Sequence, residues 1–185
     1  MIVGISGSFS SGKDTLAAHL ADKYGFMSVS TGDIVREIAQ AERGSIERPV
    51  LLEVADELRH NYGGGILVQR ALDRYHNSIC NYAGVAITGI RSLGEAKAIK
   101  ELGGTLVFVD APIELRYKRM QSRKRDDEVT ISLEEFTKRE EAELASGSSD
   151  ADFNLLAIEK LADIPLINMT SQEDFFRAAD KALFS

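Results

Sequence analysis

The chain has 185 residues, 44% of them hydrophobic, which suits one domain with a sizeable core. Its formal net charge of −7 argues against a surface that coats nucleic acid, and no apolar run is long enough to span a membrane. Met1 leads directly into an apolar segment, which leaves no room for a signal peptide. The single cysteine, Cys80, fits a reducing compartment and is expected to be a buried thiol. We therefore expect a cytoplasmic protein, a monomer or weak homodimer, that binds neither nucleic acid nor membranes.

The first predicted strand, at residues 2–6, leads into a loop framed by Gly7 and Gly12. Its hydrophobic residues suit a strand covered on both faces, and the apolar residues after Lys13 recur at helical spacing. A glycine-framed loop at a helix N-terminus directs N–H groups at a ligand. The helix dipole and the Lys13 ammonium both favour a phosphate there. The spacing is that of the phosphate-binding loop, G-x-x-x-x-G-K.

The position after the lysine departs from the strict form of this motif. Asp14 stands where Ser or Thr is expected, and Thr15 follows one residue later. A hydroxyl at this point normally contacts Mg²⁺, and the looser Gly-Lys-x-Thr form occurs in nucleotide kinases. The apolar strand before the loop and the amphipathic helix after it are the context that the motif requires. We therefore interpret residues 7–15 as a phosphate-binding loop.

A second predicted strand, at 26–29, is followed by Ser30-Thr31-Gly32-Asp33 and a helix. Thr31 and Asp33 are both suited to cap that helix. Arg36 lies in its first turns, where a cation is unfavourable against the helix dipole. A residue placed against its local preference suggests a contact with an anion.

A helical insertion is predicted between the second and third strands. A polar connection at 41–49 precedes helices at 50–60 and 66–76, which three consecutive glycines separate. Together these helices are expected to form a flap over a substrate. Arg48 and Arg59 in this region are candidate anion contacts, but we favour the interpretation that both are solvated side chains.

The rest of the chain alternates between short apolar strands and helical patterns. In the helix after Pro112 we expect Met120 to face the core, Arg116 to lie elsewhere, and Asp110 to act as the cap. The predicted strands are at 85–87, 105–109 and 164–167, and the predicted helices are at 94–102, from 113 onward, at 133–144 and at 172–183.

Five such strands separated by helices indicate a parallel sheet with helices on both faces. Ligands of these sheets bind at the carboxyl ends of the strands. Segments that carry anion-binding chemistry converge on that edge of the predicted sheet. They are residues 7–15, 31–36 and 89–91, together with Asp110 and Asn168.

These motifs resemble those of the nucleoside monophosphate kinase family, and are most similar to adenylate kinase-like and dephospho-coenzyme A kinase-like small nucleotide kinases. Residues 30–36 and 88–91 are similar to the segments that hold the acceptor nucleotide, and residues 112–123 to the helix that leads to the lid. The resemblance implies an α/β fold of the P-loop NTPase type, three α/β/α layers with a five-stranded parallel sheet. The single kinase domain, 1–185, would comprise a core at 1–30, 84–121 and 150–185, a helical NMP-binding insertion at about 31–80, and a short lid at about 122–149.

The resemblance also implies roles for the motif residues. ATP would be the phosphoryl donor, Mg²⁺ the cofactor, and a small-molecule nucleotide the acceptor. The donor side would comprise Gly7, Ser10, Ser11, Gly12, Lys13, Asp14, Thr15, Arg119 and Asn168. The acceptor would be held by Thr31, Arg36 and Arg91, the metal by Thr15 and Asp33, and catalysis would use Lys13, Asp33, Arg91, Arg123, Arg125 and Arg139. Thr88 stands where the family usually has an acid that orders a water on Mg²⁺.

Three functions remain open at this point. A nucleoside or deoxynucleoside monophosphate kinase fits the pairing of Thr31 with Arg36. A dephospho-coenzyme A kinase-like enzyme transfers to a ribose hydroxyl, for which Asp33 would serve as base. A nucleotide-binding switch with slow ATPase activity is the third, although several arginines suit two phosphorylated ligands better than one.

Overall fold

The computed structural model describes residues 1–123, 131–144 and 149–184. Its elements alternate as a parallel sheet with crossover helices requires. The strands are β1 (Ile2–Gly7), β2 (Phe26–Ser30), β3 (Gly84–Ile90), β4 (Thr105–Asp110) and β5 (Ile164–Ile167). The helices are α1 (Lys13–Tyr24), α2 (Thr31–Arg43), α3 (Arg48–Tyr62), α4 (Ile66–His76), α5 (Leu93–Glu101), α6 (Ile113–Arg123), α7 (Leu133–Leu144), α8 (Leu155–Leu161) and α9 (Gln172–Phe184).

The five strands form one parallel sheet in the order β2-β3-β1-β4-β5. β1 lies at its centre, where Gly4 pairs with Ile87 of β3 and with Leu106 of β4. Successive residues of β3 pack on opposite faces of the sheet. Val85 and Ile87 belong to one hydrophobic core, and Ala86 belongs to the other. Because both faces are buried, the strands are nearly continuous apolar runs. The predicted five-stranded parallel sheet is confirmed.

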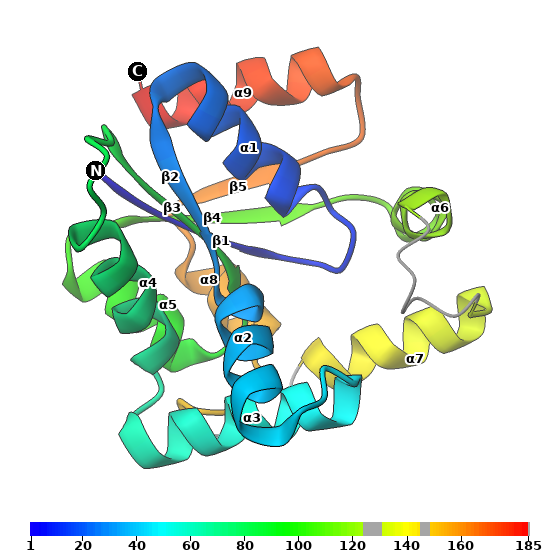
Figure 1. Ribbon diagram of the computed structural model, residues 1–185. Helices are drawn as coiled ribbons and strands as arrows, with labels where there is room; N and C mark the ends of the chain where they lie inside the picture. The colour runs from blue at the N-terminus through cyan, green and yellow to red at the C-terminus, as the bar shows by residue number, and fades with distance from the viewer. Residues whose placement is uncertain (124–130, 145–148, 185) are drawn as a thin grey trace.

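Helices cover both faces of the sheet, so the molecule has three layers (Figure 1). α1 and α9 pack on one face, around a core that includes Val3, Leu16 and Phe175. α2, α4, α5 and α8 pack on the other face, and α3 lies against α2 and α4. This is the P-loop α/β/α architecture that the sequence predicts.

α6 and α7 lie beyond the carboxyl ends of the central strands (Figure 1). A small separate core joins them, formed by Met120 of α6 and Phe136 of α7. Phe9, in the loop after β1, packs against this core with its ring centroid 5.6 Å from that of Phe136. The contact places α7 beside the glycine-framed loop. The predicted lid also includes residues 124–130 and 145–148, which lie outside the described residues.

Some predicted boundaries are wrong. α2 continues to Arg43, where Gly44 ends it with a left-handed φ of 65°, so the connection predicted at 41–49 is confined to 44–47. β3 is longer than the predicted 85–87, because Gly84, Thr88 and Ile90 also pair with the neighbouring strands.

α8 is absent from the sequence-based prediction, because seven residues are too few to display a helical period. The Asn154 side chain accepts a hydrogen bond from the Ala157 N–H at 3.0 Å and so caps this helix. Cys80 is exposed, in the connection between α4 and β3, and the expectation of a buried thiol is wrong.

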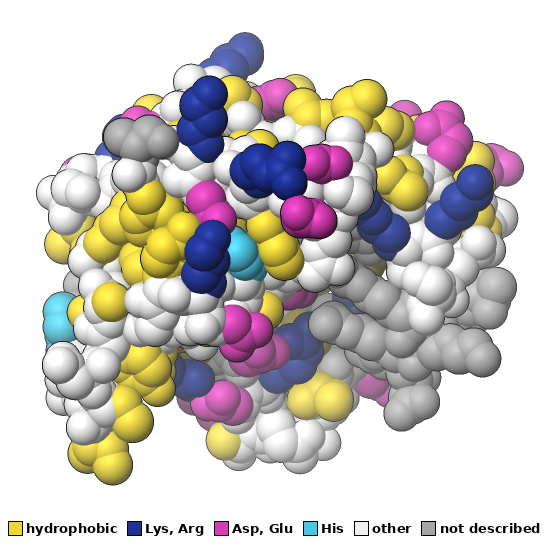
Figure 2. Space-filling model, turned by 90° about the horizontal axis from the view of Figure 1, so that it is seen from above, with side chains coloured by type: hydrophobic (Ala, Val, Ile, Leu, Met, Phe, Trp, Pro, Cys, Tyr) yellow, Lys and Arg dark blue, Asp and Glu magenta, His cyan; other side chains and the backbone are white. Residues whose placement is uncertain are grey.

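The face of the molecule that carries α1 and α9 has a mixed surface. Figure 2 shows cations and carboxylates interspersed there among apolar side chains, without a continuous basic area. Among the described residues, no helix has both the length and the apolar character needed to cross a bilayer.

Candidate active site

The loop between β1 and α1 has a backbone that glycine alone suits at its two ends. Gly7 has a φ of 136°, and a Cβ on it would lie 1.9 Å from the carbonyl oxygen of Val109 in β4. Gly12 has a φ of 108°, and its Cβ would lie 2.4 Å from the amide nitrogen of Asn168. Each position combines a left-handed backbone with a close contact, so a side chain at either would strain the loop.

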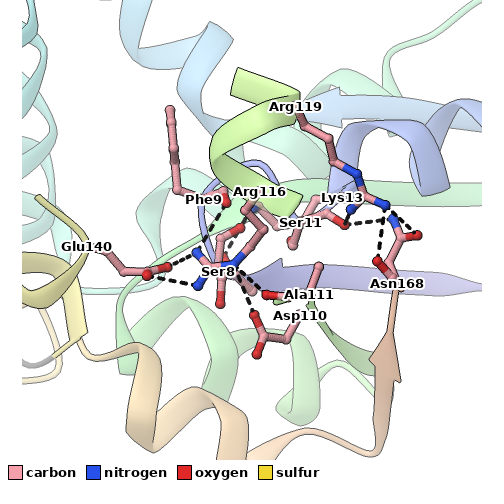
Figure 3. Close-up of polar contacts among 11 residues, drawn as sticks. Ser8, Phe9, Ser11, Lys13, Asp110, Ala111, Arg116, Arg119, Glu140 and Asn168 are labelled. Carbon is pink, nitrogen blue, oxygen red and sulfur yellow. Dashed lines mark hydrogen bonds and ion pairs between the residues drawn. The ribbon is translucent and has the colours of Figure 1, made fainter. Parts of the chain in front are cut away.

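The interior of this loop presents polar groups. Ser10 and Ser11 are buried, and within the described part of the chain their Oγ atoms have no hydrogen-bond partner. The Nζ of Lys13 donates to the carbonyl oxygens of Gly7, at 2.9 Å, and Ser8 (Figure 3). Buried hydroxyls normally find partners. A loop framed by two glycines, with unpartnered hydroxyls inside it and a lysine at a helix N-terminus, fits the phosphate groups of a nucleotide.

Arg119 of α6 and Asn168 after β5 hold the loop from one side (Figure 3). Arg119 Nη1 donates to the carbonyl oxygen of Ser11 at 3.3 Å, and Nη2 donates to the main-chain oxygen and to Oδ1 of Asn168, both at 3.1 Å. Asn168 Nδ2 donates to the same Ser11 carbonyl at 2.8 Å. The structure thus brings both predicted donor-side residues to the phosphate-binding loop.

Arg116 of α6 is buried, so the prediction that it lies away from the protein interior is wrong. It donates from Nε to the carbonyl oxygen of Ala111 at 2.6 Å, lies 3.6 Å from Asp110 Oδ1, and forms a bidentate ion pair with Glu140 of α7 (Figure 3). Asp110 ends β4 three residues before α6 begins, so it does not cap that helix as predicted. Arg116 instead links α7 to the end of β4, beside the loop.

Across from the loop, the start of α2 is attached to the end of β3. Thr31 Oγ1 donates to the carbonyl oxygen of Gly89 at 2.9 Å. Ser30, rather than Thr31 or Asp33, caps α2, because its Oγ accepts from the Asp33 N–H at 3.3 Å. Arg36 and Asp33 form an ion pair on the first turns of α2, where Asp33 is exposed and Arg36 is half-buried.

A buried ionic cluster at the end of β3 was not predicted. Glu95 of α5 is fully buried, and its Oε2 accepts from the main-chain N–H groups of Arg91 and Ser92 at 2.8 and 3.1 Å. Its Oε1 accepts from Nε and Nη2 of Arg59 at 3.1 and 2.9 Å. Arg59 is only 4% exposed, so the prediction of a solvated side chain is wrong. The guanidinium groups of Arg59 and Arg91 both lie over the ring of Phe153, at 5.0 and 5.8 Å from its centroid.

Part of this cluster has a signal in the sequence. Ser92 and Glu95 have the S-x-x-E spacing of a capping box, and the structure contains both of its hydrogen bonds. Arg59 and Phe153 have no such signal, because they meet Glu95 and Arg91 only through folding.

A cleft of about 640 Å³ joins the phosphate-binding loop to this cluster. Asp14 lines it from the first turn of α1, whereas Thr15, a predicted metal ligand, is not among the described residues that line it. The predicted acceptor residues Thr31, Arg36 and Arg91 line it as well, together with Arg59. The insertion contributes one apolar wall, formed by Val35, Ile46, Leu51, Leu52, Ala55 and Leu67.

α7 closes one side of the cleft. Arg139 lines it and pairs with Glu135 at 2.6 Å, and Glu140 lines it beside Arg139. Of the other arginines predicted for the lid, Arg123 is the last residue of α6 and Arg125 lies outside the described residues.

A family model described as an AAA domain matches residues 3–136. A UPF0200 protein of Sulfurisphaera tokodaii is 33% identical over 183 residues, and the match covers 98% of this chain and 95% of the relative. The chain belongs to the AAA domain family and to the UPF0200 proteins. A UPF0200/UPF0201 protein of Archaeoglobus fulgidus is 32% identical over 168 residues. That match covers 89% of this chain, which spans about half (49%) of the length of that relative.

Several solved structures share the fold of this UPF0200 chain. TT1252 from Thermus thermophilus has a TM-score of 0.62 at 20% identity, and the match covers 99% of this chain and 95% of that one. Shikimate kinase from Acinetobacter baumannii has a TM-score of 0.57 at 18% identity, with coverages of 98% and 90%. Dephospho-CoA kinase from Campylobacter jejuni has a TM-score of 0.54 at 20% identity, with coverages of 98% and 94%. The chain therefore has the fold of small P-loop kinases.

Proposed function

We propose that this UPF0200 chain is an ATP-dependent phosphotransferase whose acceptor is a nucleoside or deoxynucleoside monophosphate. The observation that carries the proposal is the cleft between the phosphate-binding loop and the arginines near the end of β3. A donor triphosphate at the loop and an acceptor phosphate at the arginines would face each other across it. The apolar wall from the insertion suits the flat base of a nucleotide.

Phosphoryl transfer requires in-line positioning and positive charge around the transferred group, and little covalent chemistry from the protein. In this proposal the loop N–H groups and Lys13 hold the β- and γ-phosphates of ATP. Arg36 and Arg91 hold the acceptor phosphate, and Arg139 adds positive charge from α7. A phosphate acceptor is already nucleophilic near neutral pH, so no general base is needed.

Mg²⁺ is the metal that we propose for the donor side. When bound, it neutralises charge on the phosphate oxygens. Asp14 and Asp33 are two of the carboxylates that line the cleft, and they would hold the metal, with Thr15 as the hydroxyl expected from the motif. Thr88 stands where nucleoside monophosphate kinases usually have an acidic residue, and it is buried in β3.

A second candidate is transfer to a ribose hydroxyl, and it is favoured by the structural likeness to a dephospho-CoA kinase. A hydroxyl acceptor benefits from a base, and Asp33 lines the cleft where such a base would be needed. The Arg36 guanidinium already engages that carboxylate, which favours the monophosphate acceptor.

A coupled ADP-release assay over the nucleoside monophosphates, the deoxynucleotides and dephospho-coenzyme A tests the proposal. We expect one or more monophosphates to raise ADP release well above the rate with ATP alone. Activity with dephospho-coenzyme A only, abolished by Asp33→Asn, would establish the second candidate. ADP release that no acceptor increases would instead indicate a nucleotide-binding switch with slow ATPase activity.

A further inference from the structure

Arg59 is a cleft residue that the proposed mechanism does not use. It lies on α3, is almost completely buried, and lines the cleft together with Arg91. Its Nε and Nη2 donate to Glu95. Within the described part of the chain, Nη1 has no hydrogen-bond partner. Three polar side-chain atoms of the described residues are fully buried without a hydrogen-bond partner, and Nη1 is not one of them. Nη1 is therefore accessible to solvent. A guanidinium carries five N–H donors, and Glu95 uses only part of that capacity.

Glu95 holds this arginine in one orientation. Four donors fix the carboxylate: two main-chain N–H groups at the end of β3 and two nitrogens of Arg59. The ring of Phe153 supports the guanidinium from one side. An arginine held in this way loses little conformational freedom when an anion binds, which is the advantage of preorganisation.

We propose that Arg59 is a buried anion contact on the acceptor side, and that Glu95 is the residue that positions it. Nη1 donates to a phosphate or carboxylate group of the ligand beside Arg91. The inference rests on the proposed function, because it assigns this end of the cleft to the acceptor. It deepens that function by requiring an anionic group at the inner end of the acceptor. An ion pair that served only to join α3 to α5 would need neither a place on the cleft nor an accessible Nη1.

The variants must separate binding from folding. Arg59→Met alone leaves Glu95 as an unpaired buried charge, which destabilises proteins strongly. The double variant Arg59→Met/Glu95→Gln removes both charges, and the Gln amide oxygen can still accept from the two main-chain N–H groups. Arg59→Lys is a second test, because the lysine keeps an ion pair with Glu95 but has no equivalent of Nη1. Arg43→Met is the matched control, since Arg43 pairs with exposed Glu57 and is not among the described residues that line the cleft.

The experiment is a calorimetric titration with inorganic phosphate at constant ionic strength, with ADP present to fill the donor site. The double variant and Arg59→Lys should bind phosphate more weakly than the parent by about 10- to 150-fold. Both should keep the parent's affinity for ADP, and Arg43→Met should match the parent throughout. A parallel titration with malonate distinguishes a phosphate site from a carboxylate site.

Phosphate binding by Arg59→Lys at the parent's affinity would overturn the inference, and so would a parent protein that binds neither anion. The inference would also be overturned if the folded double variant bound phosphate with the parent's affinity, because an ion pair with a purely structural role predicts no loss of binding. Failure of ADP to bind the parent would instead contradict the donor half of the proposed function. The anion titration without ADP would then still report on Arg59.

Discussion

The two ends of the cleft are built in different ways. At the end that we propose for the donor, one continuous stretch of chain forms the wall, and its shape follows from two glycines with left-handed φ angles. At the acceptor end, side chains arrive from α2, α3, the end of β3 and the segment before α8. They are held by ion pairs and by a capping glutamate rather than by a loop conformation.

This difference indicates what each end can tolerate. The donor end depends on backbone geometry, which few substitutions preserve. The acceptor end depends on side chains, which can be exchanged to suit another ligand while the sheet stays the same. Substitutions at the donor end should therefore affect the reaction with every acceptor, whereas those at the acceptor end should affect specificity.

The largest effect is expected from Lys13→Ala, at the donor end. In the proposed mechanism its ammonium would stabilise charge in the transition state, and loss of such a contact typically lowers kcat by about 10²- to 10³-fold. The fold should persist, because Lys13 is only half-buried at the helix start. Steady-state kinetics and a thermal melt check both expectations. Lys23→Ala, which removes an exposed lysine of the same helix, is the control for turnover only, because Lys23 pairs with Asp180 and its loss also affects stability. Near-normal turnover by folded Lys13→Ala would reject the site.

The next largest effects are expected from Arg36→Ala and Arg119→Ala, which test the acceptor and donor ends of the cleft separately. Arg36→Ala should raise the KM for the monophosphate acceptor or lower its turnover by about 10- to 150-fold, because a charge-assisted contact with phosphate is lost. Its KM for ATP should change little. Arg119→Ala should do the reverse, because Arg119 holds Ser11 and Asn168 at the phosphate-binding loop. Kinetics with each substrate varied in turn is the measurement. If Arg36→Ala raised the KM for ATP alone, the donor and acceptor ends would be assigned the wrong way round.

A smaller effect is expected from Asp14→Asn, and its direction should depend on whether Mg²⁺ is present. A carboxylate beside phosphates repels them unless a metal ion lies between, so the variant should bind ADP about tenfold more weakly with Mg²⁺ and more tightly with EDTA. Calorimetry under both conditions is the test. Asp22→Asn, at an exposed position on the same helix, should change neither value. A change in the same direction under both conditions would exclude Asp14 as a metal ligand.

The smallest effect lies outside the cleft, where α1 meets α9. Burial raises the pKa of Asp180, but hydrogen bonds from Lys23 and His19, each 2.7 Å long, outweigh it and hold the pKa below its ordinary value of 3.8. The stability from this group is therefore present above pH 3.8 and is lost as the pH falls through the lowered pKa. Asp180→Asn should cost about 1 kcal/mol at pH 7, or about 2–4 °C in Tm, and progressively less below pH 4.

Thermal melts of both proteins at pH 7 and pH 3 test this expectation. Kinetics at pH 7 should be unchanged, because Asp180 is not among the described residues that line the cleft. A difference in Tm that grew as the pH fell would contradict the sign of the effect.

Much of the fold could be predicted from the sequence. The strands were found because residues buried on both faces of a sheet form short apolar runs, and the long helices because their apolar residues recur with the helical period. Two of the predictions that failed concern helices. The end of α2 depends on a single capping residue, and α8 was missed because it has too few residues to show a helical period.

The glycine-framed loop could be predicted from the sequence, because Gly7, Gly12 and Lys13 belong to one local conformation that few other residues allow. The arrangement of the opposite end of the cleft could not be predicted, because it depends on contacts that form only when the chain folds. The sequence around Arg59 indicates a solvated helix residue, but in the folded chain Arg59 forms an ion pair with the fully buried carboxylate of Glu95 on α5. Local backbone preferences act between neighbours in the chain and are visible in it, whereas the burial and pairing of a charge depend on residues that become neighbours only when the chain folds.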